Sequence, residues 1–104
     1  MQALKLRIQG KVQGVGYRRW FEQQALGLGL KGYVKNLSSG DVEAVILGSE
    51  LNVNHMLQLS LAGPAHANVA SIEQTELKLD DAGFSDFKMI RDYTAWLYAV
   101  YWLF

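Results

Sequence analysis

Residues 4–28 read LKLRIQGKVQGVGYRRWFEQQALGL and join two repeat patterns through a glycine-rich turn. Leu4, Leu6 and Ile8 alternate with polar residues, which is the period-two pattern of a half-buried strand. After the turn, apolar residues recur at spacings of four, four and three, which predicts one face of a helix (Tyr17, Phe21, Ala25 and Leu28). We therefore expect a strand that passes through glycines directly into a helix, with the glycines at 27 and 29 ending that helix.

The chain after residue 30 predicts a hairpin and a second helix. Apolar residues at 33–37 and 42–47 flank Ser38-Ser39-Gly40-Asp41, which has the composition of a tight turn, so the two runs should pair as a hairpin. Between about Glu50 and Leu61, apolar residues share one helical face (Val53, Met56, Leu57 and Leu61). Gly63-Pro64 is expected to end this helix.

Two further strands complete the predicted order. A long strand is expected from Val69 to Leu79, with its alternation slipping near Ser71-Ile72 as a bulge would cause. A polar turn region at 80–86 precedes a short last strand from Phe87 to Arg91. The order βαββαβ predicts an α+β fold, a ferredoxin-like α/β sandwich with two helices on one face of an antiparallel sheet. This fold hosts many unrelated functions, so the function has to be argued from a site.

The composition limits the chemistry that this chain can carry. Its 104 residues fit one domain, and half of them are apolar, which is enough for a single core. There is no cysteine, and the two histidines, His55 and His66, have no carboxylate cluster beside them, so we expect no metal and no cofactor. An apolar leader is not seen at the N-terminus, which predicts a cytoplasmic protein.

The charges are unevenly distributed although the net charge is zero. Residues 1–36 carry seven basic side chains and one acid, Glu22, whereas residues 37–104 carry three basic side chains and nine acids. An anionic ligand should therefore meet the N-terminal third of the chain. No long basic run or repeated aromatic-basic pattern is present, so nucleic acid is not an expected partner.

The glycine-rich turn at 10–18 has the features of an anion site. Its glycines let backbone N–H groups point inward, and the following helix adds unpaired amides and the positive end of its dipole. Arg18, in the first helical turn, can add a forked and permanently charged donor. The loop lacks the GK[ST] ending of a Walker A motif and the glycine spacing of a dinucleotide fingerprint. From these residues alone, the alternatives are an anion site of unspecified purpose and a simple turn beside a solvated arginine.

Two segments resemble the signatures of the acylphosphatase family. Residues 10–18 (GKVQGVGYR) resemble G-x-V-Q-G-V-x-[FY]-R, and residues 32–42 (GYVKNLSSGDV) match G-[FYW]-[AVC]-x-N-x-x-[DS]-G-x-V. The resemblance extends over roughly residues 3–91. It implies the same ferredoxin-like fold and the hydrolysis of small acyl phosphates by water to a carboxylate and inorganic phosphate. A non-catalytic module that holds an anion or a partner in the same loop is the alternative.

The resemblance also assigns roles to individual residues. It implies that Arg18 is the phosphate-binding catalytic residue and that Asn36 orients the attacking water. The substrate-binding segment that it implies is continuous along the loop (Gln13, Gly14, Val15, Gly16, Tyr17 and Arg18). Asn36 shares strand parity with Val34, so its side chain should face the helices, although an asparagine that caps the hairpin is the alternative. Arg19 lies about 100° further round the helix and is expected to miss the anion.

The last residues of the chain lie outside the resemblance. Residues 94–104 are uncharged and almost wholly apolar, so we divide the chain into a domain at 1–92 and an extension at 93–104. A helix of this length reaches about 16 Å, too short to cross a bilayer, and no integral membrane span is expected. The extension could cover the surface of the sheet, mediate self-association through Trp96–Phe104, or dock on a membrane. A monomer is the default expectation.

Overall fold

The computed structural model describes residues 1–78 and 84–91, and all the helices and strands expected there are present. The strand expected from the alternation of Leu4, Leu6 and Ile8 extends beyond these residues on both sides. The helix expected after the glycine-rich turn begins at Tyr17. The elements run in the order β1 (Gln2–Lys11), α1 (Tyr17–Gly27), β2 (Lys31–Asn36), β3 (Val42–Gly48), α2 (Glu50–Ala62), β4 (Asn68–Glu76) and β5 (Phe87–Ile90).

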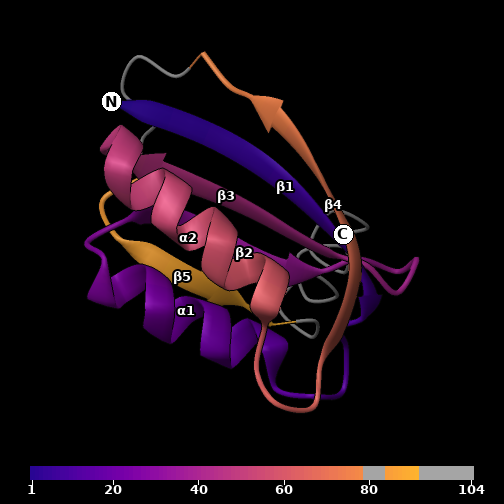
Figure 1. Ribbon diagram of the computed structural model, residues 1–104. Helices are drawn as coiled ribbons and strands as arrows, with labels where there is room; N and C mark the ends of the chain where they lie inside the picture. Colours follow the sequence, from indigo (N-terminus) through magenta and orange to yellow (C-terminus); the bar gives the residue numbers. More distant parts are fainter. Residues whose placement is uncertain (79–83, 92–104) are drawn as a thin grey trace, which may run out of the picture.

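The strands form one sheet in the order β4-β1-β3-β2-β5, and both helices lie on the same face of it (Figure 1). The contacts place α1 over β2 and β5, whereas α2 lies over β4, β1 and β3. The predicted ferredoxin-like α+β sandwich is therefore confirmed. The prediction of a purely antiparallel sheet was wrong, because β5 follows the βαββαβ unit as a fifth strand and pairs in parallel with β2. Alternation along a strand shows which face is buried but not the direction of its neighbour.

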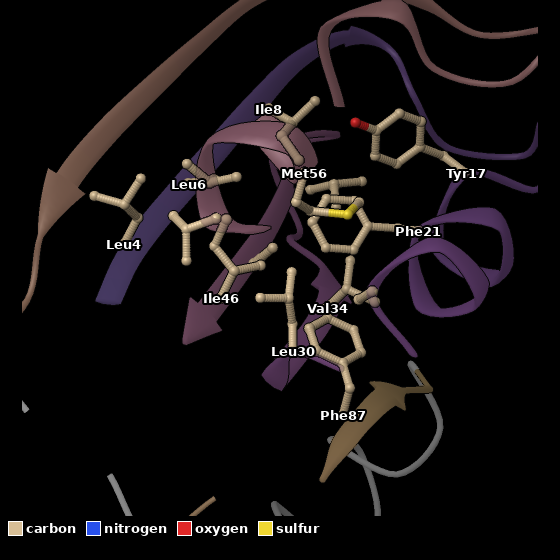
Figure 2. Packing of buried hydrophobic residues seen from close by; sticks show 14 of the residues in the cluster. Leu4, Leu6, Ile8, Tyr17, Phe21, Leu30, Val34, Ile46, Met56 and Phe87 are labelled. Carbon is tan, nitrogen blue, oxygen red and sulfur yellow. The ribbon is translucent and has the colours of Figure 1, made fainter. Parts of the chain in front are cut away.

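The core lies between the sheet and the two helices (Figure 2). Leu4, Leu6 and Ile8 of β1 are buried in it, while the intervening Lys5 and Arg7 lie on the other face of the sheet and are exposed. The expected bulge is present one residue early in β4: Gln9 pairs with Ser71 and Gly10 with Val69, which leaves Ala70 as the extra residue. Within the described residues, no helix is long and apolar enough to cross a membrane.

One face of α2 differs from its prediction. Val53 and Met56 are buried as expected, but Leu61 is 47% exposed and Ser60 takes the third buried position. Residues advance by about 100° per position in a helix, so Leu61 points well away from the line of Val53, Met56 and Ser60. Ser60 is accommodated because its hydroxyl donates to the Met56 carbonyl at 2.6 Å and its own carbonyl accepts from the Tyr17 hydroxyl at 2.7 Å.

Tyr17 joins the two helices through this buried hydrogen bond, and burial raises the pKa of its hydroxyl. We expect Tyr17→Phe to lower the free energy of unfolding by about 1–2 kcal/mol, because the buried Ser60 carbonyl loses its donor. Urea denaturation measures this. Tyr33→Phe is the matched control: its hydroxyl donates to Glu43 at 2.9 Å, but Glu43 keeps ion pairs with Lys5 and Lys35. A Tyr17→Phe loss no larger than that of Tyr33→Phe contradicts the prediction.

Candidate active site

The loop after β1, the first turn of α1 and the ends of β2 and β5 meet at one open cavity of about 580 Å³. Residues 12–14 and 16–19 line it from the loop and helix, and Asn36, Met89 and Arg91 line it from the strands. The fold thus brings Arg18 and Asn36, the two predicted catalytic residues, to the same cavity. Of the predicted substrate-binding residues, Val15 is not among the lining residues, and its side chain packs against the hydrophobic core.

Two glycines give the loop its shape. Gly14 and Gly16 have φ angles of 73° and 77°, and no other residue type has a positive φ within the described chain. The sign of φ therefore alternates from Gln13 to Tyr17. Alternation of this kind is a backbone pattern that can turn successive N–H groups to one side and form a concave site for an anion. A Cβ atom added to either glycine would meet open space, so these glycines are needed for their backbone conformation and not for room.

Gln13 attaches this loop to the hairpin. Its side-chain Nε2 donates to the carbonyl of Leu37 at 2.9 Å and to the carbonyl of Asp41 at 2.8 Å. The side chain thus holds the loop against the turn that follows Asn36. Gln13 was predicted to bind substrate, and the structure leaves that role to its backbone.

The side chain and the backbone amide of Tyr17 also have separate roles. Its ring is buried in the core beside Phe21 (Figure 2). Its hydroxyl donates to the Ser60 carbonyl. Only its backbone amide, at the start of α1, can contribute to binding an anion. The N-cap of α1 is Gly16, which provides no side-chain hydrogen bond to the helix, so an anion could accept from the first amides of the helix.

Arg18 is held in place by β5. Its Nη1 atom donates to the Ile90 carbonyl at 2.8 Å, and one turn further along α1 the Glu22 carboxylate accepts from the Met89 N–H at 2.8 Å. These two bonds fasten the helix to the edge strand. A guanidinium carries five N–H donors in a planar fork, and Arg18 lines the cavity, so its residue type and position suit an anion there.

Asn36 is the last residue of β2 and pairs with Val42 of β3. Val34, on the same side of the strand, is fully buried in the core, which confirms the predicted parity. The Asn36 Oδ1 atom is buried, and the residue lines the cavity. The turn that follows is closed by backbone bonds between Leu37 and Asp41 and by Gln13, so the hairpin has other groups to close it.

Three cavity residues outside the predicted loop at 10–18 were not assigned to the site. Arg19 lines the cavity together with Arg18, because the cavity extends around the first turn of α1, and the expectation that Arg19 misses the anion stays a prediction. Met89 lies on β5 and Arg91 directly follows it. The parallel register of β5 places Ile90 beside Lys35 and brings the ends of β2 and β5 to the same edge. The only signal in the sequence was an arginine at the end of the last predicted strand. Its relevance depends on the parallel pairing.

Gly14→Ala tests the role of the loop conformation. Alanine at a positive φ costs about 1–2 kcal/mol, and relaxation of the loop would turn its N–H groups away from a common centre. We expect the affinity for inorganic phosphate to fall by about tenfold, measured by calorimetry. Gly27→Ala is the matched control, since Gly27 ends α1 without a positive φ and a Cβ there meets no atom within 4 Å. Equal phosphate affinity in the two variants would argue against an anion site in the loop.

The family model and the curated relatives named below point to one family. The family model named Acylphosphatase matches residues 4–89, close to the extent of the predicted resemblance. The acylphosphatase of Azorhizobium caulinodans is 48% identical over 80 residues, which cover 77% of this chain and 86% of that protein. The crystal structure of acylphosphatase from Bacillus subtilis superposes with a TM-score of 0.82 at 29% identity and covers 86% of this chain and 99% of that one. An acylphosphatase from Coxiella burnetii gives a TM-score of 0.80 at 35% identity, covering 86% and 92%.

These matches cover the β1–α1 loop and the end of β2, where the two signature segments lie, as well as the arrangement of strands and helices around them. Sequence and architecture therefore lead to the same assignment, and the chain belongs to the acylphosphatase family.

Proposed function

We propose that this chain hydrolyses acyl phosphates to a carboxylate and inorganic phosphate, with water as the acceptor. The observation that carries the proposal is the shared cavity, in which Arg18, Asn36 and the glycine loop line one space. The relatives are named for this activity, which makes a non-catalytic anion-binding module the less favoured alternative.

The proposed reaction depends on positioning and on charge stabilisation. The loop amides and Arg18 bind the phosphoryl group and stabilise the charge that develops on its equatorial oxygens. The oxygen of a water attacks phosphorus while the bond to the acyl oxygen breaks, and the electron pair leaves with the carboxylate. A carboxylate is a stable leaving group, so it needs little protonation. The proton lost by the water passes to the phosphate product or to solvent.

Asn36 is proposed to orient this water. Because Oδ1 is buried, the contact is proposed to run through Nδ2, which donates a hydrogen bond to the water oxygen and fixes the direction of attack. The two hydrogen bonds from Gln13 to the hairpin turn hold the loop next to the strand that carries Asn36. The Ile90 carbonyl likewise orients the Arg18 guanidinium. We propose that these supporting contacts of Gln13 and Ile90 keep the water aligned with the phosphoryl group.

The direct test is hydrolysis of benzoyl phosphate by the purified chain in the presence of a metal chelator. We expect turnover well above the spontaneous rate, with competitive inhibition by inorganic phosphate, because the product occupies the same loop. Calorimetry with inorganic phosphate should be run in parallel. Phosphate binding without any turnover would support the binding module, and the absence of both would reject the site.

The division of the chain is proposed on the same basis. Residues 1–92 form the acylphosphatase domain and residues 93–104 an extension, in line with a family match that ends at residue 89. Self-association through Trp96–Phe104 concerns residues outside the described ones and stays a prediction, as do the monomeric state and the cytoplasmic location. Truncation after Tyr93, followed by measurement of the mass in solution, tests the extension: an unchanged mass rejects its role in association.

A further inference from the structure

We propose that the cavity selects acyl phosphates whose acyl part carries a second negative charge, and that Arg91 is the residue that binds this charge. The inference rests on the proposed hydrolase function and adds a substrate class to it. It follows from three features of the cavity: its size, its excess of positive charge, and the way in which β5 fixes the position of Arg91.

The cavity is larger than a phosphoryl group requires. Its volume of about 580 Å³ lies in the range of pockets that hold whole small-molecule ligands, roughly 300–1,000 Å³. The phosphate loop occupies one part of its wall, and Met89 and Arg91 form another. An acyl group attached to a phosphate in the loop therefore has room inside the cavity.

The charge of the lining exceeds what one phosphoryl group balances. Three arginines line the cavity (Arg18, Arg19 and Arg91), and no acidic side chain does among the described residues. Glu22, the acid nearest to them on α1, faces β5 instead and accepts from the Met89 N–H. A phosphate group carries about −1.5 to −2 charges near pH 7, and the helix N-terminus contributes about +0.5. Arg18 and that helix end offset most of the phosphate charge, so the other two arginines can accommodate another anion.

The backbone of Arg91 is held next to Arg18. The Ile90 carbonyl, which belongs to the peptide bond that leads into Arg91, accepts from Arg18 Nη1 at 2.8 Å. One residue earlier, the Met89 N–H is bound to Glu22. The backbone of the two residues before Arg91 is thus hydrogen-bonded to α1. The backbone of Arg91 is therefore held close to Arg18, the proposed phosphate-binding arginine. Arg19 follows Arg18 directly and lines the cavity from the loop and helix side, whereas Arg91 lines it from the strand side with Met89, which favours Arg91 as the residue that recognises the acyl part.

Succinyl phosphate and butyryl phosphate are matched probes for this proposal, because they differ by a terminal carboxylate in place of a methyl group. We expect the full-length chain to have a higher kcat/KM for succinyl phosphate. Arg91→Gln should lower the ratio of the two kcat/KM values by about tenfold, since it removes a charge-assisted hydrogen bond. Arg91→Lys should keep part of the preference, because the charge remains without the fork.

Lys88→Gln is the matched control, because it removes one positive charge from the same strand at an exposed position outside the cavity lining. The ratio should stay at the wild-type value in this variant. An unchanged ratio in Arg91→Gln, or a wild-type chain without preference for succinyl phosphate, overturns the inference while the hydrolase function stands. If neither probe is hydrolysed, both the proposed function and the inference fail.

Discussion

Arg18→Ala is expected to lower kcat/KM for benzoyl phosphate by about a thousandfold or more. Removing one preorganised donor to a developing oxyanion costs about 10²–10³ in rate, and an arginine that stabilises a transferred phosphoryl group is worth about 10³–10⁵. Arg18 combines these roles in the proposed site, because it stands in the first turn of α1 beside the glycine loop. Steady-state kinetics should show a higher KM and a lower kcat together. A residual activity above about a tenth would contradict the assignment.

The controls for this variant have to separate chemistry from structure. Arg18 also holds the Ile90 carbonyl, so its loss removes one of the bonds between α1 and β5. Thermal unfolding should show that Arg18→Ala is still folded, and free guanidinium added to the assay should restore part of the rate by filling the vacated space. Lys31→Ala removes an equal charge at the opposite end of β2, where Lys31 is exposed and pairs with Leu47. That variant should keep its kcat/KM.

Asn36→Ala is expected to lower kcat by about a hundredfold while the affinity for inorganic phosphate changes little. The side chain is proposed to orient the water and not to bind the phosphoryl group, and correct alignment of a reacting group is worth about this much. The two quantities are measured separately, kcat by steady-state kinetics and phosphate affinity by calorimetry.

The matched control for Asn36 is Asn54→Ala, since Asn54 is exposed on α2 and does not line the cavity. Its kcat should equal that of the wild type. If Asn36→Ala loses phosphate affinity by the same factor as kcat, then Asn36 binds phosphate and the proposed division of roles is wrong. An unchanged kcat would contradict a role in orienting the water and would support the alternative, in which Asn36 caps the hairpin.

The patterns that were predicted correctly all depend on local chemistry. Leu4, Leu6 and Ile8 alternate, so β1 could bury them on one face whatever its neighbours were. The helical face of α1 and the glycine turn before it likewise arise within a few residues of one another. Spacing gave the wrong answer at Leu61, because the buried side of α2 runs through Val53, Met56 and Ser60, and Leu61 lies about 100° further round the helix than Ser60.

The candidate site was predictable where a motif carried it and unpredictable elsewhere. Arg18 and Asn36 belong to recognisable segments, and strand parity with Val34 placed Asn36 on the correct face. The role of the Gln13 side chain was not visible, because its two acceptors lie on a turn more than twenty residues away in the sequence. The lining position of Arg19 was not visible either, because its angle around the helix says nothing about the width of the cavity.

By itself, the sequence of this protein determined its elements, its glycine-rich loop and the choice of Arg18 and Asn36 as candidate site residues. Each of these follows from residue periodicity, from the backbone freedom of glycine or from a motif of contiguous residues. Only the tertiary structure decided that β5 runs parallel to β2, that its end closes the cavity with Met89 and Arg91, and that Glu22 faces β5. The reason is physical: the pairing direction of a strand and the position of its end depend on contacts between distant segments, and periodicity within one segment does not record them.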